Sequence, residues 1–322
     1  MKKISIMTPC YNEEENVFEL YSRVKEIFKN LNYNYEHLFI DNCSTDKTVS
    51  ILEDIASRDK NVKIIENSRN FGHIRSPWHG MLQTEGDAVI SLVADFQDPP
   101  ELIPEFLKKW EDGYKIVLAQ KTKSKENKLV YFLRTAYYKF LRNISEVELL
   151  DNVTGFGLYD KSVVEIFRKL KEPYPYGRGI ICEIGFEKAL IKFTQPKRKH
   201  GKTKNNFYTL YDMAMLGIVN NSRLPLRIAT ISGFILGILS LIIAMVYFVL
   251  KIIFWDSFNA GIAPILIGIF FFSAIQLVFI GILGEYIGVL LTRVTDRPHV
   301  FEKKRVNFDN ETSVSTTKES DK

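Results

Sequence analysis

The sequence predicts an α/β fold, with a mostly parallel sheet covered by helices on both faces, followed by a two-helix transmembrane hairpin. Three observations lead to this prediction. The first stretch of about 200 residues alternates short β-branched runs with helical patterns, which is typical of parallel sheets. Two long uncharged apolar runs come next, and basic residues flank them on both sides. The hydrophobic content of 46% is enough for a sizeable core as well as these runs.

The expected strands and helices alternate along the first part of the chain. Strands are expected at KISIMT, EHLFID, VKIIEN, DAVISLV and KIVLAQ. A helix is expected over EEENVFELYSRVKEIFKN, because Val17, Leu20, Val24, Ile27 and Leu31 fall on one face. Further helical patterns occupy TDKTVSILEDIAS and the segment around PELIPEFLKKW. Alternation of this kind predicts a sheet with helices on both faces.

The apolar runs lie at about 228–250 and 262–284. Neither contains a charged residue, and each is long enough to cross about 30 Å of hydrocarbon as a helix. Both are apolar all round, whereas the alternative, a buried core helix, is usually shorter. Because basic residues precede the first run and follow the second, the positive-inside rule predicts that both termini are cytoplasmic. The chain is therefore expected to be a multi-pass protein of the inner (plasma) membrane.

Four segments follow from this division of the chain. They are a cytosolic domain at 1–204, a juxtamembrane amphipathic segment at 205–227, the hairpin at 228–291, and a cytosolic basic and disordered tail at 292–322. The net charge of +5 is mild and collects beside the membrane runs. This distribution favours anionic lipid headgroups over nucleic acid as a partner.

Polar motifs follow the first four predicted strands. They are PCYNEEEN, DNCSTDKT, NSRNFGH and ADFQDPP, in chain order. Parallel strands end at the same edge of a sheet, and ligands bind at that edge in α/β proteins. Each motif alone is also ordinary turn chemistry, since Asn, Asp, Ser and Pro favour turns and helix starts. Four such motifs in register predict a binding site.

These motifs, in this order and followed by a membrane hairpin, resemble those of family 2 glycosyltransferases. The resemblance is strongest to the polyprenyl-phosphate type, which includes bactoprenol glucosyltransferase and dolichol-phosphate mannose synthase, and it extends to about Phe301. It implies the GT-A fold, a Rossmann-like fold of nucleotide-diphospho-sugar transferases. It also implies an inverting hexosyltransferase that moves a sugar from a nucleotide sugar, expected to be a UDP-sugar, to a polyprenyl (undecaprenyl) phosphate at the cytoplasmic face. Such an enzyme would serve the cell envelope, would be a homo-oligomer and would have a flippase as a possible partner.

The motif ADFQDPP predicts a metal site. Cleavage of a sugar nucleotide leaves a diphosphate whose growing negative charge a hard cation, Mg²⁺ or Mn²⁺, stabilises through oxygen ligands. Asp95 and Gln97 lie two apart and share a face in an extended segment, so both are expected to bind the metal, with Asp95 also catalytic. The alternative for Asp95 is a helix cap near Pro100, for which Asp98 is better placed. Family members usually have an Asp where this chain has Val93.

The same resemblance implies a nucleotide site on the first two loops. The base and ribose are expected to contact Pro9, Tyr11, Asn12 and Glu13 from the first loop and Asp41 from the second. A half-buried loop aromatic is the alternative for Tyr11. Asn42 stands where a second Asp is common in the family.

The segment FTQPKRKHGKTKNN resembles the mobile basic loop of the family. Arg198 and Lys204 are expected to bind phosphate, with Arg198 also catalytic, and Gly201 allows the loop to fold over the donor. A basic patch that binds membrane lipids is the alternative.

The segment DNVTGFGLYD departs from the family's Gly-Asp-Phe-Arg. Gly155 replaces the Asp often assigned as catalytic base, and Gly157 replaces the Arg. An acceptor phosphate needs no base, because its dianion is already the main form at neutral pH. Two alternatives remain open: transfer to a lipid-linked hydroxyl with Asp151 or Asp160 as base, and a catalytically silent membrane scaffold.

Overall fold

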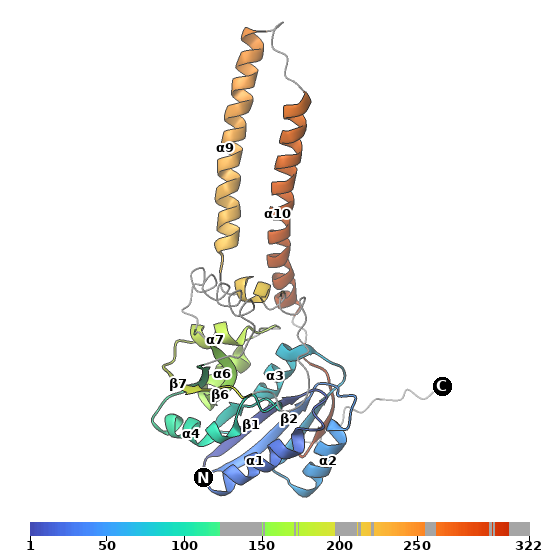
Figure 1. Ribbon diagram of the computed structural model, residues 1–322, viewed down its shortest axis with the longest axis vertical. Coiled ribbons are helices and arrows are strands. Elements are labelled where there is room, and N and C mark those ends of the chain that lie inside the picture. The colour runs from blue at the N-terminus through green and yellow to red at the C-terminus, as the bar shows by residue number, and fades with distance from the viewer. Residues whose placement is uncertain are drawn as a thin grey trace, which may run out of the picture. The chain divides into compact units, whose positions relative to one another are not determined.

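The computed structural model describes residues 1–122, 150, 152–170, 172, 174–196, 211, 214–219, 222–254, 262–295, 298 and 300–308 (Figure 1). These residues form two compact units. The first unit contains the described residues up to 196 and those from 298 onward, and the second contains residues 211–295. The domain boundary that the sequence predicts near residue 204 lies outside the described residues.

The first unit contains an eight-stranded sheet with strand order β7-β5-β6-β4-β1-β2-β3-β8. In the parallel centre of the sheet, β1 pairs with β2 and β4, and β2 pairs with β3. Strand β5 pairs in parallel with β7. Strand β6 runs antiparallel to both β4 and β5, and β8 runs antiparallel to β3. The strands are β1 (Lys3–Cys10), β2 (Asn34–Asp41), β3 (Val62–Asn67), β4 (Ala88–Ser91), β5 (Ile116–Lys121), β6 (Val153–Asp160), β7 (Lys188–Phe193) and β8 (Glu302–Val306).

Helices cover both faces of this sheet, as the sequence predicts. One core cluster combines the sheet with α1 (Val17–Lys29), α2 (Thr48–Arg58) and α4 (Ile103–Glu111), which follows the short 3-10 helix η1 (Pro100–Leu102). The other combines it with α3 (Gly72–Leu82), α6 (Lys161–Lys169) and α7 (Gly177–Glu183). Central strands buried on both faces must be apolar almost continuously, which explains runs such as LFI in β2.

The amphipathic pattern in the first predicted helix is also present in α1. Its buried residues, Val17, Leu20, Val24 and Phe28, recur every three or four positions and face the sheet. Ile27 and Leu31 are partly buried beside them. The helix therefore stabilises the fold through one apolar stripe, while its outer face carries charged residues.

Strand β8 lies within the tail segment at 292–322, for which the sequence predicts no strand. Residues 302–306 pair with β3, and Lys303 and Lys304 form ion pairs with Glu66 and Glu53 at 2.5 and 2.7 Å. Asn307 donates its side-chain amide to two backbone carbonyl oxygens, those of Ala56 and Val62. The sequence EKKRV gave no strand signal because its charged side chains suit an exposed sheet edge rather than a buried strand.

The second unit contains two long apolar helices, α9 (Leu224–Ile253) and α10 (Ile262–Val294). Both are candidate membrane spans: the most apolar 18-residue stretch has a mean hydropathy of 2.7 in α9 and 2.3 within Ile267–Val294, and neither stretch is buried. Apolar surface of this extent requires an apolar environment. Within the unit, the Tyr286 hydroxyl donates to the Ser222 carbonyl at 2.7 Å and ties α10 to the start of α9.

Candidate functional site

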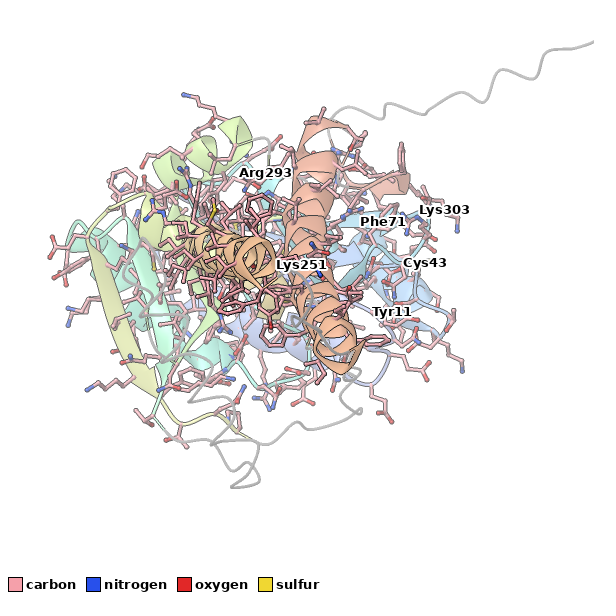
Figure 2. All side chains as sticks on the ribbon, turned by 90° about the horizontal axis from the view of Figure 1, so that it is seen from above. Tyr11, Cys43, Phe71, Lys251, Arg293 and Lys303 are labelled. Atoms are coloured by element: carbon pink, nitrogen blue, oxygen red, sulfur yellow. The ribbon has the colours of Figure 1, made fainter. Side chains whose placement is uncertain are left out.

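The predicted site residues that the structure describes lie at the carboxyl edge of the parallel strands. Tyr11, Cys43 and Phe71 come just after β1, β2 and β3, and Figure 2 shows them following one another in that order. Two non-glycine residues of these loops have positive φ, Asn12 at 56° and Cys43 at 65°, and Phe96 in the loop after β4 has a φ of 60°. Backbone of this kind is strained for L-residues and clusters at functional sites.

The loops after β1 and β2 are joined by hydrogen bonds. The Asn12 backbone N–H donates to Ser44 Oγ at 2.9 Å, and the Thr45 N–H donates to Asn12 Oδ1 at 2.8 Å. The Glu13 N–H donates to Thr48 Oγ1 at 2.8 Å. These contacts give Asn12 and Glu13 a structural role that the sequence did not reveal, and they hold the surface where a nucleotide is predicted to bind.

Asp41 lies at the end of β2 and is completely buried. Its two carboxylate oxygens accept hydrogen bonds from the backbone N–H and the hydroxyl of Ser44, at 2.9 and 2.5 Å. Burial raises the pKa of Asp41, and the bonds from Ser44 oppose that rise. In the structure Asp41 therefore shapes the second loop, and its contact with a nucleotide stays a prediction. Pro9 and Tyr11 are half-buried at the same edge.

Asn42 connects the second loop to the third. Its Nδ2 donates to Asn70 Oδ1 at 2.9 Å and to the Gly72 carbonyl at 3.3 Å. Its Oδ1 accepts from Asn67 Nδ2 at 3.1 Å and from the Phe71 backbone N–H at 2.9 Å. An aspartate in this position would accept but not donate, so the bonds to Asn70 and Gly72 would be lost. This network explains why the chain has an amide where family members often have an acid.

Asp95 and Gln97 lie in a turn, not in the extended segment that the sequence suggested. Strand β4 ends at Ser91, and the Gln97 backbone N–H donates to Asp95 Oδ1 at 3.0 Å around Phe96, which has positive φ. The turn, rather than strand alternation, therefore brings these two residues together. Asp95 is 8% exposed and Gln97 is half-buried.

Asp98 does not cap the following helix. Residue 99 is the N-cap of η1, and no side chain bonds to the helix start, so the expected capping role is wrong. Asp98 is instead buried. Burial, and then the charge of Asp95, raise the pKa of Asp98 to about 7, against a smaller opposing effect of Lys121.

The oxygen ligands predicted in this chain suit a hard divalent cation that receives most of its other ligands from water and substrate. Within the described part of the chain, no three His, Cys, Asp or Glu side chains converge to form a metal cage. One carboxylate and one amide, with the oxygens of a bound diphosphate, are a normal set for Mg²⁺ or Mn²⁺. Asp95 and Gln97 are the residues predicted to supply the carboxylate and the amide.

The antiparallel direction of β6 removes Asp160 from the site. Asp160 is paired with Ala88 at the start of β4, whereas Gly157 is paired with Ser91 at the end that leads to Asp95. The Asp160 carboxylate caps α6 by accepting from Ser162, and also accepts from Trp110 Nε1 at 2.8 Å. Asp160 is therefore not the base considered for a hydroxyl acceptor.

The two glycines of β6 differ in the space around them. A Cβ on Gly157 would lie 2.5 Å from the Val117 carbonyl oxygen, so the arginine of the family has no room on this backbone. A Cβ on Gly155 would meet no atom within 4 Å. Three other predicted residues, Asp151, Arg198 and Lys204, lie outside the described residues.

Comparison with known proteins identifies the family. Residues 5–167 match the family described as glycosyl transferase family 2. The putative glycosyltransferase CsbB of Bacillus subtilis is 36% identical over 301 residues, covering 94% of this chain and 91% of that protein. The bactoprenol glucosyl transferase of Shigella phage SfX is 33% identical over 304 residues, covering 94% and 99%.

Among solved structures, glucosyl-3-phosphoglycerate synthase from Mycobacterium tuberculosis is 16% identical with a TM-score of 0.45, covering 68% of this chain and 76% of that one. At this level the likeness carries no argument about function. The sequence relatives span nearly the whole chain, and the family region covers the loops after β1 to β4. The chain belongs to glycosyl transferase family 2.

Proposed function

We propose that this glycosyltransferase moves a hexose from a UDP-sugar to a polyprenyl phosphate, such as undecaprenyl phosphate, at the cytoplasmic face of the plasma membrane. The observation that carries the proposal is the alignment with the bactoprenol glucosyl transferase. It covers 94% of this chain, and therefore includes both the sheet and the apolar helices. The lipid-linked sugar would then serve synthesis or modification of a cell-surface glycan.

The nucleotide is proposed to bind over the ends of β1 and β2. Pro9 and Tyr11 are half-buried there, and Asn12 and Glu13 are held in place by the second loop. Preorganised loops lose little conformational entropy when a ligand binds. Asp41 is proposed to contribute by fixing the Ser44 turn.

The donor diphosphate is proposed to lie at the end of β4. Asp95 and Gln97 would hold Mg²⁺ or Mn²⁺, which would neutralise charge on the leaving diphosphate when bound. Arg198 and Lys204 are proposed to bind the phosphate oxygens from the basic loop. Direct in-line attack by the acceptor oxygen on the anomeric carbon inverts the configuration of the sugar.

The positions of the carboxylates favour a phosphate acceptor, which needs no catalytic base. Gly155 stands where many relatives have an acid, and Asp160 lies at the opposite end of β6. A phosphate monoester with a second pKa near 6 is mostly dianionic at neutral pH, so its oxygen attacks without a base. A hydroxyl acceptor would need a base such as Asp151. The chain retains Asp95 and Gln97 in a turn closed by a hydrogen bond, which argues against a catalytically silent membrane scaffold.

Strand β8 supports a hairpin topology for the membrane segment. The chain leaves the sheet unit before α9 and rejoins the same sheet as β8 after α10. If both helices cross the bilayer, the two flanks must then lie on one side, and the positive-inside rule predicts that this side is the cytoplasm. Reporter fusions after Asn205 and Thr295 should therefore report the cytoplasm, and a fusion after Asp256 the outside. An external report from either flank would contradict the hairpin. A homo-oligomer and a flippase partner are further predictions.

The direct test uses membranes that contain the full-length protein. They are incubated with undecaprenyl phosphate and, one at a time, several labelled sugar nucleotides, and the lipids are then extracted. One donor should label the lipid fraction, only when the lipid phosphate is added, and Asp95→Asn membranes should not. Label that reaches only free sugar, or a lipid alcohol in place of the phosphate, would exclude the proposed acceptor.

A further inference from the structure

Arg75 is a cation near the site with no assigned role. It lies in the first turn of α3, directly after the Asn70–Gly72 loop that Asn42 holds in place. Its Nε is buried and has no hydrogen-bond partner, and no ion pair forms between Arg75 and any described residue. A buried guanidinium nitrogen without a partner is costly, so a ligand that accepts a hydrogen bond from it would be bound favourably.

Tyr174 holds the Arg75 side chain from the other side. Arg75 Cζ lies 5.2 Å from the centre of the Tyr174 ring, a cation–π contact that orients the planar guanidinium. Tyr174 precedes α7, whose first turn carries Arg178. Arg75 of α3 therefore contacts the segment that leads into α7, and that helix carries the second guanidinium group, Arg178.

These segments share one rigid core with β6. Trp78 of α3 and Tyr159 of β6 both contact the Phe167 ring, with centroids 4.8 and 5.9 Å apart respectively. Ile180 and Ile181 of α7 belong to the same cluster. In Figure 1, α3, α6 and α7 lie together on this side of the sheet. The arginines are thus mounted on packed helices and not on independent loops.

The position of β6 connects this cluster to Asp95. Burial raises the pKa of Tyr159, while the charge of Arg178 lowers it and that of Asp98 raises it, so both groups act on the same hydroxyl. Strand β6 neighbours β4 on the side away from β1 and β2, where the nucleotide is proposed to bind. Helix α7, which carries Arg178, packs in the same core cluster as Tyr159 of β6, so an anion held by Arg178 would lie on the β6 side of the proposed donor site.

Resting on the proposed function, we propose that Arg75 and Arg178, with Tyr174 orienting the first, form the subsite that binds the phosphate of the lipid acceptor. The subsite compensates for Gly157, where the backbone has no room for the arginine of other family members. Two cations also offset the repulsion between an acceptor dianion and the donor diphosphate. Arginine suits this task because its planar fork binds phosphate oxygens in pairs.

The test measures binding as well as transfer, on the full-length protein in detergent. Affinities for farnesyl phosphate, farnesol and UDP are compared in the wild type, Arg75→Gln, Arg178→Gln and Arg75→Lys. Farnesol controls for partition of the chain into detergent. The matched control is Arg58→Gln, because Arg58 is exposed on α2 and pairs only with Asp54 among the described residues.

The wild type should bind farnesyl phosphate more tightly than farnesol. Each Gln variant should lose roughly 10-fold or more of that preference, with Arg75→Lys intermediate and UDP affinity unchanged. A wild type without preference for the phosphate, or Gln variants that keep the preference, would overturn the subsite. Loss of UDP affinity with the preference retained would assign the cations to the donor and overturn the acceptor role.

Failure of the proposed function has a different signature. In that case no donor would label added undecaprenyl phosphate, while farnesyl phosphate binding would still depend on Arg75 and Arg178. The subsite would then stand as a site for a phosphate monoester, because binding is measured without turnover. Retained UDP binding in each variant confirms that the sheet unit is folded.

Discussion

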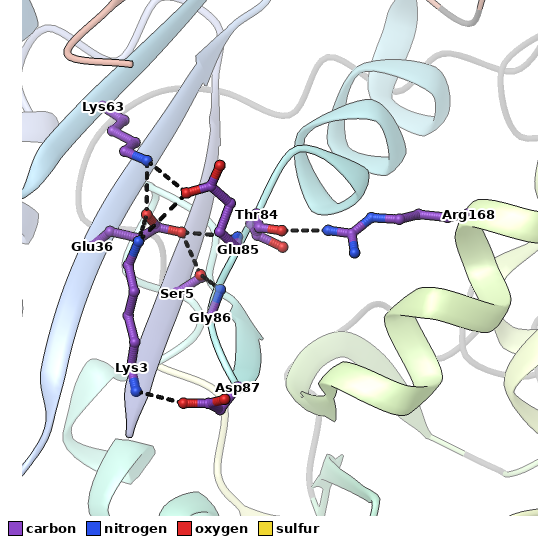
Figure 3. A network of polar contacts seen from close by, with 9 residues as sticks. All are labelled: Lys3, Ser5, Glu36, Lys63, Thr84, Glu85, Gly86, Asp87 and Arg168. Atoms are coloured by element: carbon purple, nitrogen blue, oxygen red, sulfur yellow. Dashed lines mark hydrogen bonds and ion pairs between the residues drawn. The ribbon is translucent and has the colours of Figure 1, made fainter. Parts of the chain in front are cut away.

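Glu36 is expected to be a major source of stability in the sheet unit. It is 3% exposed at the start of β2, the end of the strand opposite the functional site. Its carboxylate forms ion pairs with Lys3 at 2.5 Å and Lys63 at 3.1 Å (Figure 3). It also accepts hydrogen bonds from Ser5 Oγ at 2.6 Å and from the Glu85 backbone N–H at 3.1 Å.

The size of the effect follows from the pKa of Glu36. Burial acts to raise this pKa, but the bonds from Lys3, Ser5 and the Glu85 N–H, with the charge of Lys63, outweigh it and lower the pKa from 4.5 to about 2. That difference corresponds to about 3 kcal/mol of stability. Breaking a buried ion pair by removing one partner costs a similar amount, roughly 3–5 kcal/mol. Glu36→Gln should therefore lower Tm by roughly 6–12 °C for a unit of this size.

The assay is thermal unfolding of the detergent-solubilised protein followed by tryptophan fluorescence. Two of the three tryptophans of the chain, Trp78 and Trp110, are buried in the sheet unit, so a change in their fluorescence reports on its unfolding. Glu26→Gln is the control, because its pair with Lys29 is exposed, and it should shift Tm by no more than about 2 °C.

The pH dependence has a definite sign. The folded pKa of Glu36 lies below its unfolded value, so its stabilisation is complete above about pH 4.5 and is lost as the pH falls toward 2. The difference in Tm between wild type and Glu36→Gln should therefore shrink on acidification. A variant that melts within about 2 °C of the wild type at pH 7 would show that desolvation cancels the ion pairs, and the reasoning would be wrong.

Three further predictions concern the site and the strand that follows the membrane helices. Asp95→Asn should reduce turnover far more than UDP affinity, because the metal acts on charge that develops during bond cleavage; unchanged turnover with full dependence on Mg²⁺ or Mn²⁺ would place the metal elsewhere. Gly157→Ala should destabilise the protein because its Cβ would lie 2.5 Å from the Val117 carbonyl oxygen, whereas Gly155→Ala has space; equal melting temperatures would contradict this difference. Glu302→Gln should speed amide hydrogen exchange in β8, because Glu302 accepts hydrogen bonds from His79 and Arg305; exchange as slow as in the wild type would mean that backbone pairing alone holds the strand.

Local sequence patterns were sufficient for the central architecture. The predicted strands from KISIMT to KIVLAQ correspond to β1 to β5, because a buried parallel strand must be apolar and its loops polar. The family and the apolar helix pair were predicted for the same reason: each rests on residues close together in the chain. The edge of the sheet that holds the site follows from strand direction, which the alternation of strands and helices implies.

The remaining features depend on contacts between distant segments. Strand β8 is recognisable only through its pairing with β3, since EKKRV has no apolar pattern of its own. The role of Asn42 depends on four hydrogen bonds, two donated and two accepted, which only an amide can make. The role of Asp160 depends on the antiparallel direction of β6, which puts this acid at the end of the sheet opposite the site.

The sequence by itself therefore determined the fold class, the family and the two long apolar helices, because these depend on local periodicity and short motifs. Only the tertiary structure decided which carboxylates lie outside the site, that Gly157 has no room for an arginine, and that Arg75 meets Tyr174. Those facts depend on strand direction, backbone crowding and packing between helices, which are properties of the assembled chain and not of any one segment.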